Sequence, residues 1–217
     1  MKQFRFGILG AGGIAHKFCN AVGKVDDACV AAVASKDQKR AWRFAKRHGI
    51  EDFYSDYEHL LAREDIDAIY IATTHNFHYE NIIACLEHNK PVLCEKSMVP
   101  TAAQAQEIFS LAKEKKLFVM EAMWSRFLPH INQARQWIKE GRIGNLEAAT
   151  CTIGFSASRD PAHRINNPVL GGGAAYDIGV YAIELTTYLI DEPVIDVQSI
   201  LCLLYTSDAA DEARSVD

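Results

Sequence analysis

The sequence lacks the features that define several classes of protein. No run of apolar residues approaches the roughly 18 that a membrane span requires. The amino terminus carries neither the apolar core nor the cleavage site of a signal peptide. Basic residues are not in excess, because 23 Lys and Arg stand against 28 Asp and Glu for a net charge of −5. We therefore expect neither a membrane partner nor a nucleic acid held by bulk charge.

Cysteine is present but is not arranged for a site. The six cysteines are scattered along the chain, and no C-x-x-C pair occurs. This spacing disfavours a zinc site and a disulfide framework. We therefore predict no metal centre and a location in the reducing cytoplasm.

What is present suits a folded α/β protein. Apolar residues make up 49% and charged residues 24% of the 217 residues, enough for one large domain or one domain with part of another. Up to about residue 120, compact apolar runs alternate with helical patterns. That alternation predicts a doubly wound parallel sheet whose strands are buried on both faces. The expected strands are Phe4–Leu9, Val30–Ala34, Ala68–Ala72, Val92–Cys94 and Leu117–Met120.

Helices are expected between these strands. One ends at Gly49, a typical helix stop, and another begins at Thr101, which with Gln104 fits a capping box. The pattern changes near Glu121, where we place a domain boundary. A helix ending at Gly141, an alternating strand over Leu146–Phe155, a loop, a helix from Ala175 to about Leu189 and a strand-like stretch, Val194–Leu201, follow it. We expect residues 1–121 to form a complete domain and residues 122–201 a truncated one.

The last residues differ in kind. The segment from Cys202 to Glu212 matches the in-frame translation of a transposon-end sequencing adaptor. We interpret residues 202–217 as a non-native tail, the alternative being an ordinary polar carboxyl terminus.

A glycine motif follows the first expected strand directly. Gly10-Ala11-Gly12-Gly13-Ile14-Ala15 fits G-x-G-x-x-A. The first glycine permits a tight turn, the second lets the backbone approach a pyrophosphate, and the small alanine permits close helix packing. The motif predicts a dinucleotide site. Its candidate residues are Gly10, Gly12, Gly13, Ile14 and Ala15.

The end of the second expected strand bears on the cofactor. An acidic residue there would bind ribose hydroxyls, but the chain has Ser35 and Lys36, with Arg40 one turn later. These side chains can donate to a 2′-phosphate, so NADP(H) is favoured over NAD(H). Two alternatives stay open: Lys36 faces only water, or Asp37 binds a ribose in a shifted register.

Polar side chains also close the third and fourth expected strands. Because ligands of doubly wound sheets bind at the carboxyl ends of strands, we expect these residues to line the cleft. Lys96 can donate a hydrogen bond to a substrate oxygen, although a strand-end lysine is often only a surface residue. His78 alternatively begins a helix. The candidates are Thr73, His75, Asn76, His78, Glu95 and Lys96.

A second pair of candidates lies on the helix expected from Ala175. Asp177 and Tyr181 are four residues apart, so both project from one face. A phenol beside a carboxylate and a lysine can act as a general acid or base. Taken alone, the pair is more typical of an ordinary helix start and a tyrosine packed on a sheet.

Together these motifs resemble the glucose–fructose oxidoreductase / inositol dehydrogenase family, known as Gfo/Idh/MocA. The resemblance covers Phe4 to about Leu201, and Glu121-Ala122-Met123-Trp124-Ser125-Arg126-Phe127-Leu128-Pro129 is most similar to the dihydrodiol dehydrogenase-like branch. It implies a Rossmann domain followed by an α/β domain with an open, mainly antiparallel sheet that often forms an oligomer interface. It also implies a catalytic Lys96, cleft roles for Asp177 and Tyr181, and cofactor contacts from Trp124 and Arg126.

The resemblance has two departures. Ser97 stands where the family usually has proline, and Tyr181 where many members have histidine, although the dihydrodiol dehydrogenase-like branch carries tyrosine. We expect an NADP(H)-dependent oxidoreductase that interconverts alcohol and carbonyl on a small sugar-like, polyol or cyclic-diol substrate, the full-length parent being a homo-oligomer. The alternatives are a non-catalytic redox sensor that binds dinucleotide, and an inactive fragment.

Overall fold

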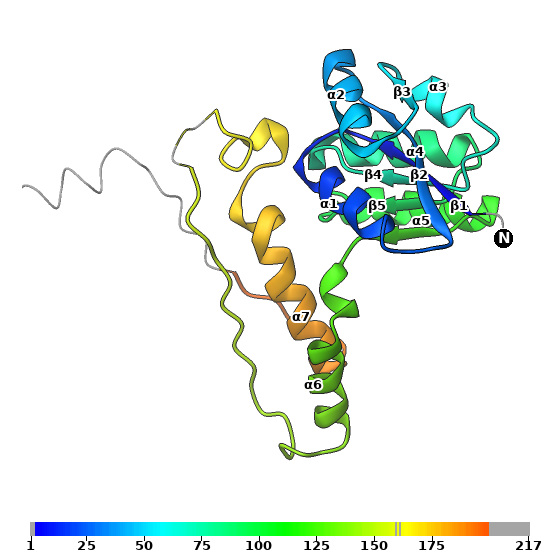
Figure 1. The fold of residues 1–217 in the computed structure, drawn as a ribbon. Helices are drawn as coiled ribbons and strands as arrows, with labels where there is room; N and C mark the ends of the chain where they lie inside the picture. Colours follow the sequence, from blue (N-terminus) through cyan, green and yellow to red (C-terminus); the bar gives the residue numbers. More distant parts are fainter. Residues whose placement is uncertain (1–2, 159, 161, 200–217) are drawn as a thin grey trace, which may run out of the picture.

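The first part of the chain, up to Glu121, is built around a six-stranded parallel sheet (Figure 1). The computed structural model describes residues 3–158, 160 and 162–199. The strands are β1 (Phe4–Leu9), β2 (Ala28–Ala34), β3 (Asp52–Tyr54), β4 (Ala68–Ile71), β5 (Val92–Cys94) and β6 (Val119–Glu121). Their order is β3-β2-β1-β4-β5-β6, the order of a doubly wound dinucleotide-binding sheet, whose ligands bind where the order reverses between β1 and β4. The predicted α/β fold is confirmed.

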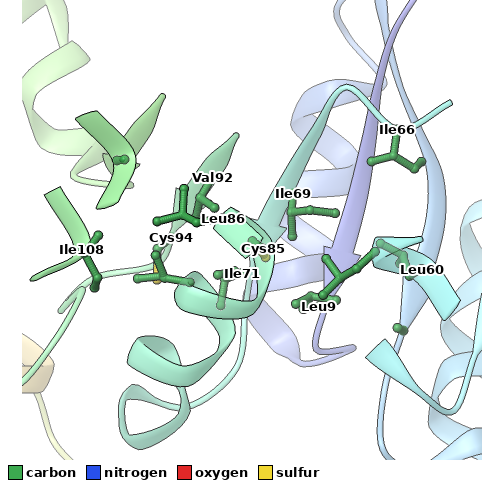
Figure 2. Close-up of a cluster of buried hydrophobic side chains, with 14 of the residues drawn as sticks. Leu9, Leu60, Ile66, Ile69, Ile71, Cys85, Leu86, Val92, Cys94 and Ile108 are labelled. Carbon is green, nitrogen blue, oxygen red and sulfur yellow. The ribbon is translucent and has the colours of Figure 1, made fainter. Parts of the chain in front are cut away.

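Both faces of the sheet are buried. Along β1, Ile8 belongs to one apolar cluster and Leu9 to the other, and β4 alternates in the same way at Tyr70 and Ile71. Helices α1 (Gly13–Val22) and α2 (Gln38–His48) contribute to the cluster of Ile8. Helices α3 (Tyr57–Leu61), α4 (His78–Glu87) and α5 (Ala102–Lys115) contribute to that of Leu9 (Figure 2). Each fully buried aliphatic side chain adds about 1.5–3 kcal/mol to folding.

The expected helix boundaries hold where the backbone explains them. Gly49 ends α2 at a φ of +67°, in the left-handed region that glycine adopts at low cost. Thr101 begins α5, and its Oγ1 accepts the N–H of Gln104 at 3.3 Å. The capping box is only half formed, because Gln104 Oε1 is buried without a hydrogen-bond partner.

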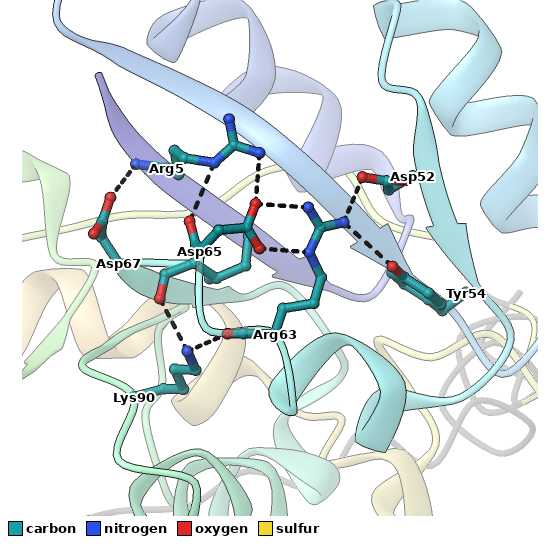
Figure 3. Close-up of polar contacts among 8 residues, drawn as sticks. Arg5, Asp52, Tyr54, Arg63, Asp65, Asp67 and Lys90 are labelled. Carbon is teal, nitrogen blue, oxygen red and sulfur yellow. Dashed lines mark hydrogen bonds and ion pairs between the residues drawn. The ribbon is translucent and has the colours of Figure 1, made fainter. Parts of the chain in front are cut away.

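A polar network ties the chain together where the strands begin, at the end of the sheet opposite the cleft (Figure 3). Arg63 donates to both carboxylate oxygens of Asp65, at 2.9 and 2.8 Å, and to Asp52. Arg5 also donates to Asp65, and buried Lys90 donates to the backbone oxygen of Arg63. The guanidinium of Arg63 holds the pKa of Asp65 well below its usual range. These contacts fix the segment between α3 and β4.

The chain after Glu121 is mainly helical. It contains 3₁₀ turns over Trp124–Phe127 (η2) and Pro168–Leu170 (η3), α6 (Pro129–Lys139), a π-helical turn over Ala175–Gly179 (η4) and α7 (Val180–Ile190). Helices α6 and α7 lie side by side (Figure 1), joined by Arg135, which donates to the Tyr188 carbonyl at 3.0 Å and to Asp191 at 2.6 Å. No helix among the described residues is long and apolar enough to cross a membrane.

The strand expected over Leu146–Phe155 is wrong. The segment is extended but pairs with no strand in the described part of the chain, and Ile153 and Phe155 are exposed (Figure 1). Alternation gives a segment two different faces, but a strand needs a neighbour to bond its backbone. Residues 194–199 of the expected stretch Val194–Leu201 are unpaired for the same reason. The tail, 202–217, lies outside the described residues.

Candidate active site

The turn between β1 and α1 fits a pyrophosphate. Gly10 has a φ of +96°, and a Cβ there would lie 2.9 Å from the backbone carbon and oxygen of Ala72, so only glycine is tolerated. A Cβ on Gly12 would come no nearer than 3.9 Å to another group, and one on Gly13 would meet nothing within 4 Å. Ala15 is fully buried. Because Gly12 caps α1 without a side chain, the first N–H groups of the helix meet no capping side chain.

The turn after β2 presents positive charge. Lys36 Nζ lies 5.1 Å from the ring centre of Phe77 and 5.9 Å from that of Tyr57, beside a hollow of about 310 Å³. Arg40 is exposed at the start of α2, whereas Ser35 is buried. Asp37 caps α2, because its Oδ1 accepts the N–H of Arg40 at 3.1 Å. That capping bond uses one oxygen of the carboxylate considered for the ribose, and a ribose contact of Asp37 stays an alternative.

Lys96 follows β5 and reaches across to the last helix. Its Nζ donates to the backbone oxygen of Asp177, lies 3.9 Å from Oδ1 of the same residue, and sits 4.8 Å from the ring centre of Tyr181. Burial lowers the pKa of Lys96, and the charges of Asp177 and Glu95 act in the opposite direction. The three residues expected to be catalytic, Lys96, Asp177 and Tyr181, therefore lie together.

Asp177 has a second partner that sequence reasoning missed. Arg164 donates from NH1 to Asp177 Oδ1 at 3.1 Å, and Asp177 is only 7% exposed. The loop before η4 folds back on itself, because Gly173 donates its N–H to the carbonyl of Ile165 at 2.7 Å. That return places Arg164 beside the carboxylate. Nothing in the sequence distinguishes this arginine from the others in the chain.

Tyr181 receives a hydrogen bond from the segment that follows β6. The indole N–H of Trp124, in η2, donates to the Tyr181 oxygen at 2.7 Å. Burial raises the pKa of Tyr181, and the charges of Glu95 and Asp177 raise it further, whereas the bond from Trp124 lowers it. Tyr181 is a protonated phenol at neutral pH.

Glu95 lies between the end of β5 and Lys96. Tyr70 donates its O–H to Glu95 Oε1 at 2.5 Å, and Glu95 Oε2 accepts the N–H of Lys96 at 3.3 Å. Burial raises the pKa of this carboxyl. The geometry suits the support of Lys96, and a direct contact with cofactor stays a prediction.

The remaining predicted cofactor residues make contacts within the protein. Thr73 Oγ1 accepts from Asn81 at 3.1 Å, and Thr74 donates its hydroxyl to Asn76 Oδ1 at 2.7 Å. Arg126 pairs with buried Glu184 at 2.5 Å. His75 and His78 face backbone carbonyls. Ile14 is partly exposed on α1. Their roles toward a cofactor stay predictions.

Comparison with known proteins decides the family. Residues 4–123 match the oxidoreductase family with an NAD-binding Rossmann fold, GFO_IDH_MocA, and residues 131–215 match the GFO/IDH/MocA C-terminal domain. The chain belongs to the Gfo/Idh/MocA family. The chain is 38% identical over 199 residues to D-xylose 1-dehydrogenase (NADP(+)) of Hypocrea jecorina and 36% identical over 185 residues to trans-1,2-dihydrobenzene-1,2-diol dehydrogenase of Xenopus tropicalis. These relatives support the dihydrodiol dehydrogenase-like branch.

The Gfo/Idh/MocA relatives are longer than this chain. The two alignments cover 82% and 84% of this chain but 51% and 56% of the relatives, so the chain spans about half their length. A similar solved structure is a 3-ketoreductase from Actinomadura kijaniata in complex with NADP and TDP-benzene, with a TM-score of 0.76 and 33% identity. The aligned region covers 87% of this chain and 58% of the ketoreductase chain.

Proposed function

We propose that the full-length protein is an NADP(H)-dependent oxidoreductase that interconverts an alcohol and a carbonyl on a small sugar-like, polyol or cyclic-diol substrate. The observation that carries this proposal is the convergence of Lys96, Asp177 and Tyr181 at the carboxyl end of the sheet, where the glycine turn also lies. Two relatives are named for a sugar and for a cyclic diol, which supports this substrate class. A homo-oligomer in the cytoplasm stays a prediction.

The residues divide the chemistry between them. When bound, the nicotinamide ring supplies or accepts the hydride. Tyr181 holds the proton that the substrate oxygen gains during carbonyl reduction, and its raised pKa keeps that proton in place at neutral pH. Lys96 stabilises the negative charge that develops on the same oxygen. Asp177, fixed by Arg164, orients the Lys96 ammonium.

The direct test is cofactor turnover by the full-length protein. We expect NADPH oxidation with ketone forms of sugars or polyols, followed by absorbance, and NADP⁺ reduction with the matching alcohols. The alternative is a non-catalytic redox sensor. A full-length protein that binds NADPH tightly but turns over none of a broad panel of sugars, polyols and cyclic diols would favour the sensor.

Cofactor preference depends on Lys36. A charge-assisted contact to a 2′-phosphate is worth about 1.5–3 kcal/mol, so Lys36→Ala is expected to weaken NADPH binding by roughly tenfold or more. NADH binding should barely change, because NADH has no 2′-phosphate. Titration of the reduced nicotinamide fluorescence measures both affinities.

The control for this change is Lys39→Ala. Lys39 is an exposed lysine on α2, three residues beyond Lys36. The variant removes the same charge and should leave the ratio of NADPH to NADH affinity unchanged. If Lys36→Ala lost the same affinity for NADPH and for NADH, the assignment of Lys36 to the 2′-phosphate would be contradicted.

A further inference from the structure

Two histidines hold the backbone of the turn that carries Lys96. His78 is fully buried, with Nδ1 2.9 Å from the carbonyl oxygen of Ser97 and Nε2 3.1 Å from that of Thr73. His75 places Nε2 3.0 Å from the carbonyl oxygen of Lys96 and Nδ1 3.1 Å from that of Gly171. The two consecutive carbonyls of Lys96 and Ser97 thus each meet one imidazole ring.

We propose that His75 and His78 are positioning residues for Lys96, and that His75 also joins the Lys96 turn to the loop that leads to Asp177. The proposal rests on the proposed function for the role of Lys96 in the reaction. The predicted cofactor contacts of His75 and His78 stay predictions beside it.

The close approach of His75 to the loop is built into the sequence at Gly171. Gly171 has a φ of +71°, and a Cβ there would lie 2.8 Å from the Cβ of His75. Any other residue would therefore push the loop away from the imidazole. A glycine at this point lets the ring reach the Gly171 carbonyl.

The same loop and the turn after it are tied to the Lys96 turn at two more points. Ser97 donates its hydroxyl to the Tyr176 carbonyl at 2.8 Å, and Lys96 donates its ammonium to the Asp177 carbonyl. Together with the His75 bond, these contacts fix the Lys96 turn against residues 171–177. The ammonium is therefore placed by backbone contacts on both sides of the cleft as well as by its charge.

His78 suits a fixed support. Burial lowers its pKa, so the ring is neutral and has one N–H to donate. A neutral ring packed between two carbonyls donates a hydrogen bond to one of them, and its other nitrogen can only accept. The ring of His75 lies edge-on to it, with ring centres 5.6 Å apart, so displacement of His78 also disturbs His75.

The test measures the acid–base behaviour of Lys96 in the chain of 217 residues. Trace labelling of amines with acetic anhydride over a range of pH, read by mass spectrometry of the Lys96 peptide, gives the titration midpoint and the limiting labelling rate. His78→Leu should move the midpoint of Lys96 up toward the ordinary lysine value, because the ammonium leaves its buried position. The limiting rate should rise severalfold. His78→Gln, which retains a donor, should recover most of both changes.

The matched control is His88→Leu. His88 lies just after α4, and its Nδ1 is 2.9 Å from the carbonyl oxygen of Ala84. It removes a histidine–carbonyl contact away from the cleft and should leave Lys96 unchanged. If His78→Leu does not fold by circular dichroism, the half-buried His75→Leu takes its place with the same expectation.

The proposal is overturned if a folded His78→Leu or His75→Leu chain labels Lys96 with the midpoint and rate of His88→Leu. That outcome is separable from failure of the proposed function. Labelling needs no substrate and no turnover, whereas the proposed function fails when the full-length protein does not oxidise or reduce nicotinamide.

Discussion

Replacing Tyr181 by phenylalanine is expected to lower turnover of the full-length protein by roughly a hundredfold or more, the usual scale for a general acid or base. The Tyr181 oxygen accepts a hydrogen bond from Trp124, and the Lys96 ammonium lies over the Tyr181 ring. Because the oxygen only accepts in that bond, its O–H is free to donate to a substrate oxygen. Removal of that O–H leaves the reduced substrate oxygen without its proton. NADPH affinity should barely change.

The pH profile distinguishes chemistry from packing. Because the pKa of Tyr181 is raised, the phenol stays protonated through neutral pH, and the rate of carbonyl reduction should stay level there. The rate should fall on the alkaline side, first as Lys96, whose pKa burial lowers, loses its charge, and further as the phenol ionises. In Tyr181→Phe the part of the limb that belongs to the phenol should disappear, and the part that belongs to Lys96 should remain.

Tyr188→Phe is the control on the same helix. Its O–H donates to Asn132 Oδ1 at 2.7 Å, away from Lys96, so turnover should stay close to that of the unaltered protein. Lys96→Ala should cost as much as Tyr181→Phe, because the charge on the substrate oxygen is then left without its cation. Near-normal turnover of Tyr181→Phe at all pH values would make this tyrosine a packing residue.

The sheet was predictable because its strands are short apolar runs between helical patterns. All five expected strands start and end within two residues of the observed ones, and β1 and β5 match at both ends. β3 was not expected, because Asp52–Tyr54 has three residues and begins with a carboxylate. β3 forms because its backbone pairs with β2, and no local sequence pattern indicates that pairing.

The main residues of the site were predictable and their partners were not. Lys96 was predictable because it follows the end of a strand. Asp177 and Tyr181 were predictable because residues four apart lie on the same face of a helix. Arg164 reaches Asp177, 13 residues further along the chain, because the loop between them folds back, and Glu184 binds Arg126 across 58 residues. The first pair depends on the path of an irregular loop and the second on the packing of segments far apart in the sequence.

One missed signal was present in the sequence. Asp37 stands directly before a helical pattern, the position where aspartate caps a helix. The capping bond to Arg40 therefore follows from local chemistry, without knowledge of the sheet. The cap does not exclude Asp37 as a ribose ligand, because a carboxylate has a second oxygen.

An aspartate at Gly12 is expected to change stability and cofactor affinity in opposite directions. Gly12 caps α1 with a φ of −93°, which any residue adopts, and a Cβ there would come no closer than 3.9 Å to another group. A carboxylate at a helix amino terminus accepts the free N–H groups and suits the dipole. Gly12→Asp should therefore stabilise the cofactor-free chain by about 0.5 kcal/mol.

The same carboxylate would occupy the place of the pyrophosphate. Like charges brought together cost several kcal/mol, so NADPH and NADH should both bind more than about a hundredfold more weakly. Gly12→Asn separates shape from charge and should lose less affinity, while Gly154→Asp, where a Cβ meets nothing within 4 Å, should lose none. Thermal unfolding and nicotinamide fluorescence measure the two effects. Unchanged NADPH affinity in a stable Gly12→Asp chain would show that the phosphates bind elsewhere than at the amino terminus of α1.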